Sequence, residues 1–125
     1  MNEKQRALLK ELADFLDDYD SVDHEGKEFD MCDWSCESSA CAVGHAYHFL
    51  PSWREAGLEM VSRTDLRTRP KFNGETDFEA VATFLGISLL ESQALFDPDF
   101  YNGADGTIPW EVACRIYAFL EGEPA

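Results

Sequence analysis

Apolar side chains recur at helical spacing over most of this chain. The first such stripe, predicted as a helix over residues 3–19, consists of Leu8, Leu12, Phe15, Leu16 and Tyr19. Similar patterns predict a shorter helix over 53–61, helices beginning near Thr76 and Ser88, and a last helix over 108–121. The spacing therefore indicates a largely helical protein.

Local signals mark where several of these helices begin and end. The segments from Thr76 to Glu79 and from Ser88 to Glu91 have the residues of a capping box, in which a hydroxyl and a glutamate satisfy the first backbone N–H groups. Gly86 is typical of the residue that closes a helix. Pro109 suits the first turn of the last helix, where a missing N–H does no harm.

The segment from Ala40 to Leu50 contains no carboxylate, lysine or arginine. Ser38 and Ser39 are candidate N-caps for it, and Pro51 is expected to stop it. A helix that is apolar on all sides is typical of the middle of a core. We therefore expect this segment to be buried, with Gly44 allowing another element to approach closely.

These patterns predict an all-α fold. Residues 1–125 are interpreted as a single compact domain, a bundle of five or six helices. The most irregular part contains Pro70 and the turn signal Asn73-Gly74, and one short strand or hairpin is allowed there, near 66–73.

Composition narrows the function classes. Twenty-five acidic residues face ten basic ones, for a formal net charge of −15. Such a charge repels phosphates, so we expect no direct contact with nucleic acid. No apolar run reaches the ~20 residues that a membrane span needs, and the first residues show no apolar signal segment. The sequence therefore predicts a cytoplasmic protein without a membrane partner.

The densest acidic stretch begins within the first predicted helix. Its candidate residues for a protein-binding face are Asp14, Asp17, Asp18, Asp20, Asp23 and Glu25. One interpretation is a solvated surface that keeps the protein soluble. The other is a face that attracts a basic partner, by imitating a phosphate backbone or by docking on a groove rich in arginine and lysine. The sequence leaves both interpretations open.

Cysteine and histidine residues cluster around the charge-free segment. Cys41, His45 and His48 would share one face of a helix, and Cys32 or Cys36 could complete a tetrahedral zinc site, although the spacing matches no standard pattern. The alternative is that buried cysteines act as small apolar residues. A Cys/His nucleophile is a third interpretation, but no oxyanion-hole signature accompanies it. We predict no cofactor and no enzymatic activity, with zinc bound by Cys32, Cys36, Cys41 and His45 as the alternative.

Two regions of the chain carry short motifs. The first has an aspartate-and-tryptophan loop, Phe29-Asp30-Met31 to Trp34, followed by Cys36 to Ala46, which is similar to the pattern Cys-Gly-Thr-x-x-Cys-x-x-Gly-x-Ala with Glu37-Ser38 in place of Gly-Thr. The second comprises Leu85-Gly86-Ile87-Ser88 and the later Leu95-Phe96. Both resemble a small family of phage and bacterial proteins of unknown function. The resemblance implies a phage or prophage accessory protein. Together with the charge, it leads to the hypothesis of an acidic module that inhibits or decoys a basic, nucleic-acid-handling host complex.

Overall fold

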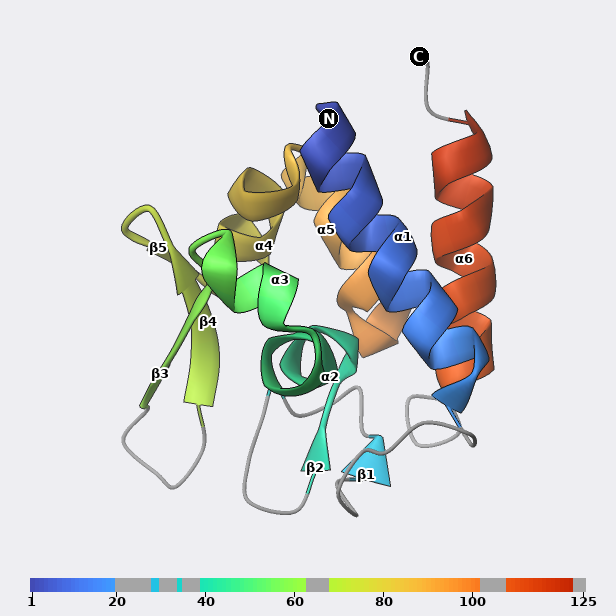
Figure 1. Ribbon diagram of the computed structural model, residues 1–125, viewed down its shortest axis with the longest axis horizontal. Helices are drawn as coiled ribbons and strands as arrows, with labels where there is room; N and C mark the ends of the chain where they lie inside the picture. The colour runs from blue at the N-terminus through green and yellow to red at the C-terminus, as the bar shows by residue number, and fades with distance from the viewer. Residues whose placement is uncertain (20–27, 30–33, 35–38, 63–67, 102–107, 123–125) are drawn as a thin grey trace.

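The computed structural model describes residues 1–19, 28–29, 34, 39–62, 68–101 and 108–122. In chain order the elements are α1 (Glu3–Asp17), β1 (Glu28–Phe29), β2 (Ser39–Ala40), α2 (Ala42–Phe49), α3 (Pro51–Glu55), β3 (Glu59–Ser62), β4 (Thr68–Phe72), β5 (Glu75–Thr76), α4 (Asp77–Leu85), α5 (Leu89–Phe96), the 3-10 helix η2 (Pro98–Phe100) and α6 (Pro109–Gly122). Figure 1 shows α1 and α6 on one side and the three strands β3, β4 and β5 on the other, with α2, α3 and α4 between them.

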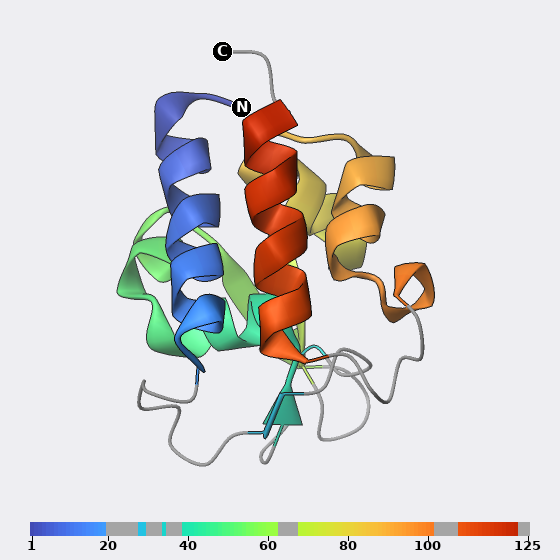
Figure 2. The same cartoon turned by 90° about the vertical axis from the view of Figure 1, so that its right-hand side faces the viewer.

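Helices α1 and α6 lie side by side and antiparallel (Figures 1 and 2). Their buried side chains are Leu8, Leu9, Leu12, Ala13 and Leu16 from α1, and Val112, Ala113, Ile116 and Leu120 from α6. A capping box begins α1: Gln5 N donates to Asn2 Oδ1 at 2.8 Å, and Asn2 N donates to Gln5 Oε1 at 2.9 Å. The helix predicted over residues 3–19 is therefore confirmed within two residues of its end.

The charge-free segment is buried, as predicted, but its start differs. Ser39–Ala40 forms β2, which pairs in parallel with β1, and Cys41 is the N-cap of α2 in place of a serine. Every residue from Ala42 to Ala46 is buried, whereas His48 is exposed. At Gly44 a Cβ would lie 1.9 Å from the backbone oxygen of Trp34, so only glycine permits this close approach.

The helix predicted over 53–61 stops early. Helix α3 ends at Glu55, and Gly57 follows with φ +109°, a conformation that other residues rarely adopt. Trp53 within α3 is fully buried, and its indole Nε1 donates to the backbone oxygen of Leu8 at 3.1 Å. Residues 59–61, which the sequence pattern assigns to this helix, belong instead to β3.

The all-α prediction is wrong, because β3, β4 and β5 form an antiparallel sheet in that order. The short strand or hairpin allowed near 66–73 is, in the described residues, the strand β4, which pairs with β3 on one side and with β5 on the other. The turn between β4 and β5 is made by Asn73 and Gly74, both with positive φ, as their sequence signal indicates. The fold is therefore mixed, with both helices and a sheet.

A shared aromatic contact attaches this sheet to the helices. The ring of Phe72 lies 5.2 Å from that of Phe84, and Phe84 in turn lies 5.3 Å from Trp53. Helix α4 packs against β4. These rings come from three elements that are separate in the sequence, so the pattern within any one segment does not reveal the sheet.

The starts of α4 and α5 test the two predicted capping boxes. Thr76 is the N-cap of α4, but its side chain makes no capping hydrogen bond, so that box is wrong. At α5 the box is confirmed: Glu91 N donates to Ser88 Oγ at 3.0 Å, and Ser88 N donates to Glu91 Oε1 at 2.9 Å. Gly86 ends α4 with φ 68° and ψ 36°, the left-handed conformation that its position predicts.

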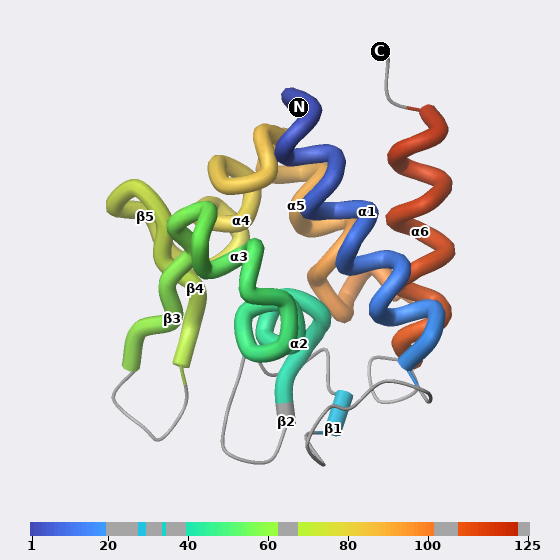
Figure 3. The backbone as a smooth tube through the Cα atoms, in the orientation of Figure 1, coloured from blue at the N-terminus to red at the C-terminus, as the bar shows by residue number. Residues whose placement is uncertain are grey.

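Among the residues that the structure describes, no single helix has both the length and the apolar character to cross a membrane. Helices α4 and α5 reach that threshold only when they are counted together. The backbone turns by 107° between them (Figure 3).

Candidate functional site

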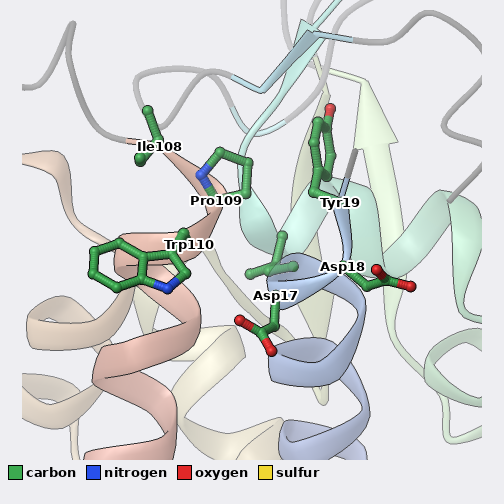
Figure 4. A pocket seen from close by; sticks show the side chains of 7 residues that line it. Asp17, Asp18, Tyr19, Ile108, Pro109 and Trp110 are labelled. Atoms are coloured by element: carbon green, nitrogen blue, oxygen red, sulfur yellow. The ribbon is translucent and has the colours of Figure 1, made fainter. Parts of the chain in front are cut away.

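A groove opens where the end of α1 meets the start of α6 (Figure 4). We name it the acidic–aromatic groove and define it by Leu16, Asp17, Asp18, Tyr19, Ile108, Pro109 and Trp110. Its volume is about 430 Å³, within the range of small ligand-binding sites. Because α1 and α6 are antiparallel, residues from the two ends of the sequence meet there.

Two carboxylates supply the negative charge of this groove. Asp17 is the last residue of α1 and Asp18 is its C-cap. In Figure 4 the carboxylate of Asp17 extends into the gap toward Trp110, whereas that of Asp18 points to the other side of α1. The last turn of α1 contains no basic residue, and a helix C-terminus itself carries partial negative charge. The ion pairs found among the described residues involve neither carboxylate.

The opposite wall of the groove is apolar and exposed. Trp110 and Ile108 retain 57% and 50% of their full exposure. Trp110 lies two residues before the buried Val112 in α6, and two residues correspond to a rotation of about 200° around a helix. The indole therefore stands away from the core-facing stripe. An exposed tryptophan beside carboxylates is a surface that a cationic side chain can contact.

Tyr19 connects the groove to the core. Its hydroxyl lies 2.9 Å from Nε2 of His45, which is fully buried, and Nδ1 of His45 lies 3.0 Å from the backbone oxygen of Cys41. Aromatic rings surround His45 at centroid distances of 5.3 to 6.4 Å; they belong to Phe15, Tyr19, Phe29 and Phe49. The side chain of Tyr19 is thus held between the groove and the core.

The acidic residues predicted from the sequence do not all lie in this groove. Asp14 lies one turn earlier on α1, where Lys10 Nζ donates to it at 3.1 Å and the hydroxyl of Tyr117 donates to its other carboxylate oxygen. The hydrogen bond from Tyr117 is the main cause that lowers the pKa of Asp14 below its usual 3.8. Burial, followed by the carboxylate of Asp14, raises the pKa of Tyr117. Asp20, Asp23 and Glu25 lie outside the described residues.

The predicted zinc set is only partly described, because Cys32 and Cys36 lie outside the described residues. Cys41 is 2% exposed, and its thiol donates to the backbone oxygen of Trp34 across 3.8 Å. Both ring nitrogens of His45 already have hydrogen-bond partners, so zinc would have to displace one of them. Within the described part of the chain no three metal-binding side chains converge. Zinc at this cluster stays the untested alternative to the prediction of no metal.

A second groove lies at the opposite end of the same helix pair. We name it the basic groove and define it by Arg6, Ala7, Lys10, Tyr117, Leu120 and Glu121, with a volume of about 390 Å³. Arg6 Nη2 donates to the backbone oxygen of Leu120 at 3.0 Å. Lys10 forms its ion pair with Asp14. Arg6 and Lys10 therefore each have a partner within the protein, and Nη1 of Arg6 is buried without one among the described residues.

Sequence reasoning missed Trp110 and Ile108. A signal was present, because a tryptophan at the start of an amphipathic helix and outside its apolar stripe has no core position to fill. What the sequence could not supply was the juxtaposition with Asp17, which depends on how α1 and α6 pack.

No protein-family model, curated protein or solved structure matches this chain. The resemblance of residues 36–46 and 85–96 to small phage and bacterial proteins therefore stays a prediction.

Proposed function

We propose that this chain is an acidic protein-binding module whose partner presents a basic surface to the acidic–aromatic groove. The observation that carries the proposal is the pairing of an exposed indole, Trp110, with a carboxylate, Asp17, that no described cation neutralises. Apolar contact supplies affinity in such a surface, and the charges supply attraction and orientation.

The net charge of −15 supports a basic partner over any polyanion. A field of this sign accelerates the approach of a cationic protein and repels nucleic acid. The C-terminal end of α1 contributes in the same direction, because the partial negative charge of a helix C-terminus adds to the charge of Asp17 and Asp18.

The sequence resemblance supplies the setting of the proposal. In a phage or prophage accessory protein acting in the bacterial cytoplasm, such a module would inhibit or decoy a basic host protein or a nucleic-acid-handling complex. Binding alone produces this effect, so the proposal includes no catalytic step and no cofactor.

Fluorescence anisotropy of a labelled peptide of mixed arginine and lysine tests this function on the full chain. The affinity should fall steeply between about 50 and about 500 mM NaCl, because the attraction is electrostatic. A glycine- and serine-rich peptide of equal length should not bind.

A matched pair of double variants localises the binding. Asp17→Asn with Asp18→Asn removes two charges from the groove, whereas Glu3→Gln with Glu79→Gln removes two exposed charges from other places. We expect the first pair to weaken binding roughly fivefold or more and the second to change it less than twofold. Equal losses for the two pairs would show that only the overall charge matters and would contradict the proposed site.

A further inference from the structure

We infer that the acidic–aromatic groove selects arginine over lysine, with one guanidinium lying against the indole of Trp110 and paired to Asp17. This inference rests on the proposed function and names the side chain that would anchor the partner.

The indole favours a flat cation. Trp110 is more than half exposed and lines the groove (Figure 4). Tryptophan is the aromatic residue that binds cations best. A guanidinium is planar and weakly hydrated, so it stacks on an indole, whereas an ammonium group retains its water more strongly.

The carboxylate that faces the indole adds geometry. Asp17 extends toward Trp110, and two oxygens of one carboxylate match the parallel N–H groups of a guanidinium. Asp18 points away from the indole and can act only through longer-range attraction. The two neighbouring aspartates therefore have different expected roles, which makes each the natural control for the other.

The remaining wall suits the aliphatic part of an arginine side chain. Leu16 is buried and lines the groove from α1, and Ile108 and Pro109 line it where α6 begins. A methylene stem can pack on such surface while its charged end reaches the carboxylate. The volume of about 430 Å³ leaves space for the neighbouring backbone of a docked segment.

Three labelled peptides that differ only in their charged residues test the inference. They carry arginine, lysine or citrulline, the neutral analogue of arginine, at the same positions in a glycine–serine sequence. We expect the wild-type chain to bind the arginine peptide roughly three- to fivefold tighter than the lysine peptide. Citrulline should bind weakest. The variant Trp110→Leu should lose the preference, and Asp17→Asn should weaken arginine binding more than Asp18→Asn does.

The outcomes separate this inference from the proposed function. Equal affinity for the arginine and lysine peptides overturns arginine selection. A preference that survives in Trp110→Leu overturns the contact between the guanidinium and the indole. Both results leave a basic-partner groove standing. Failure of every cationic peptide to bind overturns both. Circular dichroism checks that each variant is folded, and Trp110→Phe serves as a second variant that should retain part of the preference.

Discussion

The two ends of the α1–α6 pair are built from the same helices, but their charged side chains differ in whether they have partners within the protein. At the basic groove, Arg6 donates to the last turn of α6 and Lys10 pairs with Asp14. At the acidic–aromatic groove, Asp17 and Asp18 form no ion pair with any described residue. The two cations that line the basic groove each have a partner within the protein, whereas the two carboxylates of the acidic–aromatic groove form no ion pair among the described residues.

This difference indicates that the two ends serve different purposes. A cation at a helix C-terminus interacts favourably with the exposed carbonyl groups, so Arg6 stabilises α6 from a neighbouring helix. Two carboxylates at the C-terminus of α1 do the reverse and weaken the folded state. Stability is thus lost at the end where we propose binding, and changes at each end should separate the two properties.

The largest effect is expected from a change in the core that both ends share. Ile116 is fully buried on α6, so Ile116→Ala should lower the free energy of unfolding by about 2 to 4 kcal/mol. Urea denaturation measures this loss. The control Cys114→Ala, at an exposed position on the same helix, should change little. A loss below about 1 kcal/mol for Ile116→Ala would mean that α6 does not pack as the structure describes.

At the basic groove, Arg6→Met should reduce stability by about 1 kcal/mol, because the hydrogen bond to the backbone oxygen of Leu120 is lost. Binding of the cationic peptides should not change. Lys4→Met removes an exposed charge nearby and is the control. Weaker peptide binding in Arg6→Met at full stability would contradict a purely structural role for this end.

At the acidic–aromatic groove, Asp17→Asn and Asp18→Asn should each increase stability by about 0.3 to 1 kcal/mol at low ionic strength. Each substitution removes the repulsion between the two carboxylates and the repulsion between one carboxylate and the negative C-terminal end of α1. Added salt should reduce the gain, since it screens the same repulsion. Thermal unfolding at low and high salt measures both effects, and a loss of stability would show that these carboxylates have a partner.

The smallest effect concerns Asp14, which lies between the two ends. Its pKa is held below 3.8, chiefly by the hydrogen bond from Tyr117, so this contact stabilises the fold above that pH and is lost as the pH falls through the lowered value. Tyr117→Phe should therefore cost a few tenths of a kcal/mol near pH 6, with the difference vanishing in strong acid. Denaturation of the wild type and of Tyr117→Phe near pH 6 and in strong acid measures this difference in stability. A difference that does not change with pH would show that it comes from packing and not from the charge on Asp14.

Much of the helical framework could be predicted because its signals are local. The stripe from Leu8 to Tyr19, the capping residues Ser88 and Glu91, and the left-handed Gly86 each act within a few residues. The failures occurred where distant contacts decide. Residues 59–62 form a strand of only four residues, which is too short for its pattern to be recognised in the sequence. Phe72 packs on Phe84, which belongs to another element.

The candidate site was predictable only in part. The concentration of aspartates at the end of α1 is evident in the sequence, and two of the six predicted residues, Asp17 and Asp18, line the groove. Asp14 instead belongs to a structural contact with Lys10 and Tyr117. Composition does not separate Asp14 from Asp17 and Asp18, because all three are exposed aspartates in the last turns of the same helix or at its C-cap.

The sequence alone accounts for the excess of negative charge, for the first and last helices of the chain and for the burial of the segment around Gly44. Each follows from residue type or from spacing within one segment. The tertiary structure alone decided that a sheet joins the helices and that Trp110 stands across from Asp17. Such a meeting depends on the antiparallel contact of the first and last helices, and local patterns contain no information about the distance between chain segments so far apart.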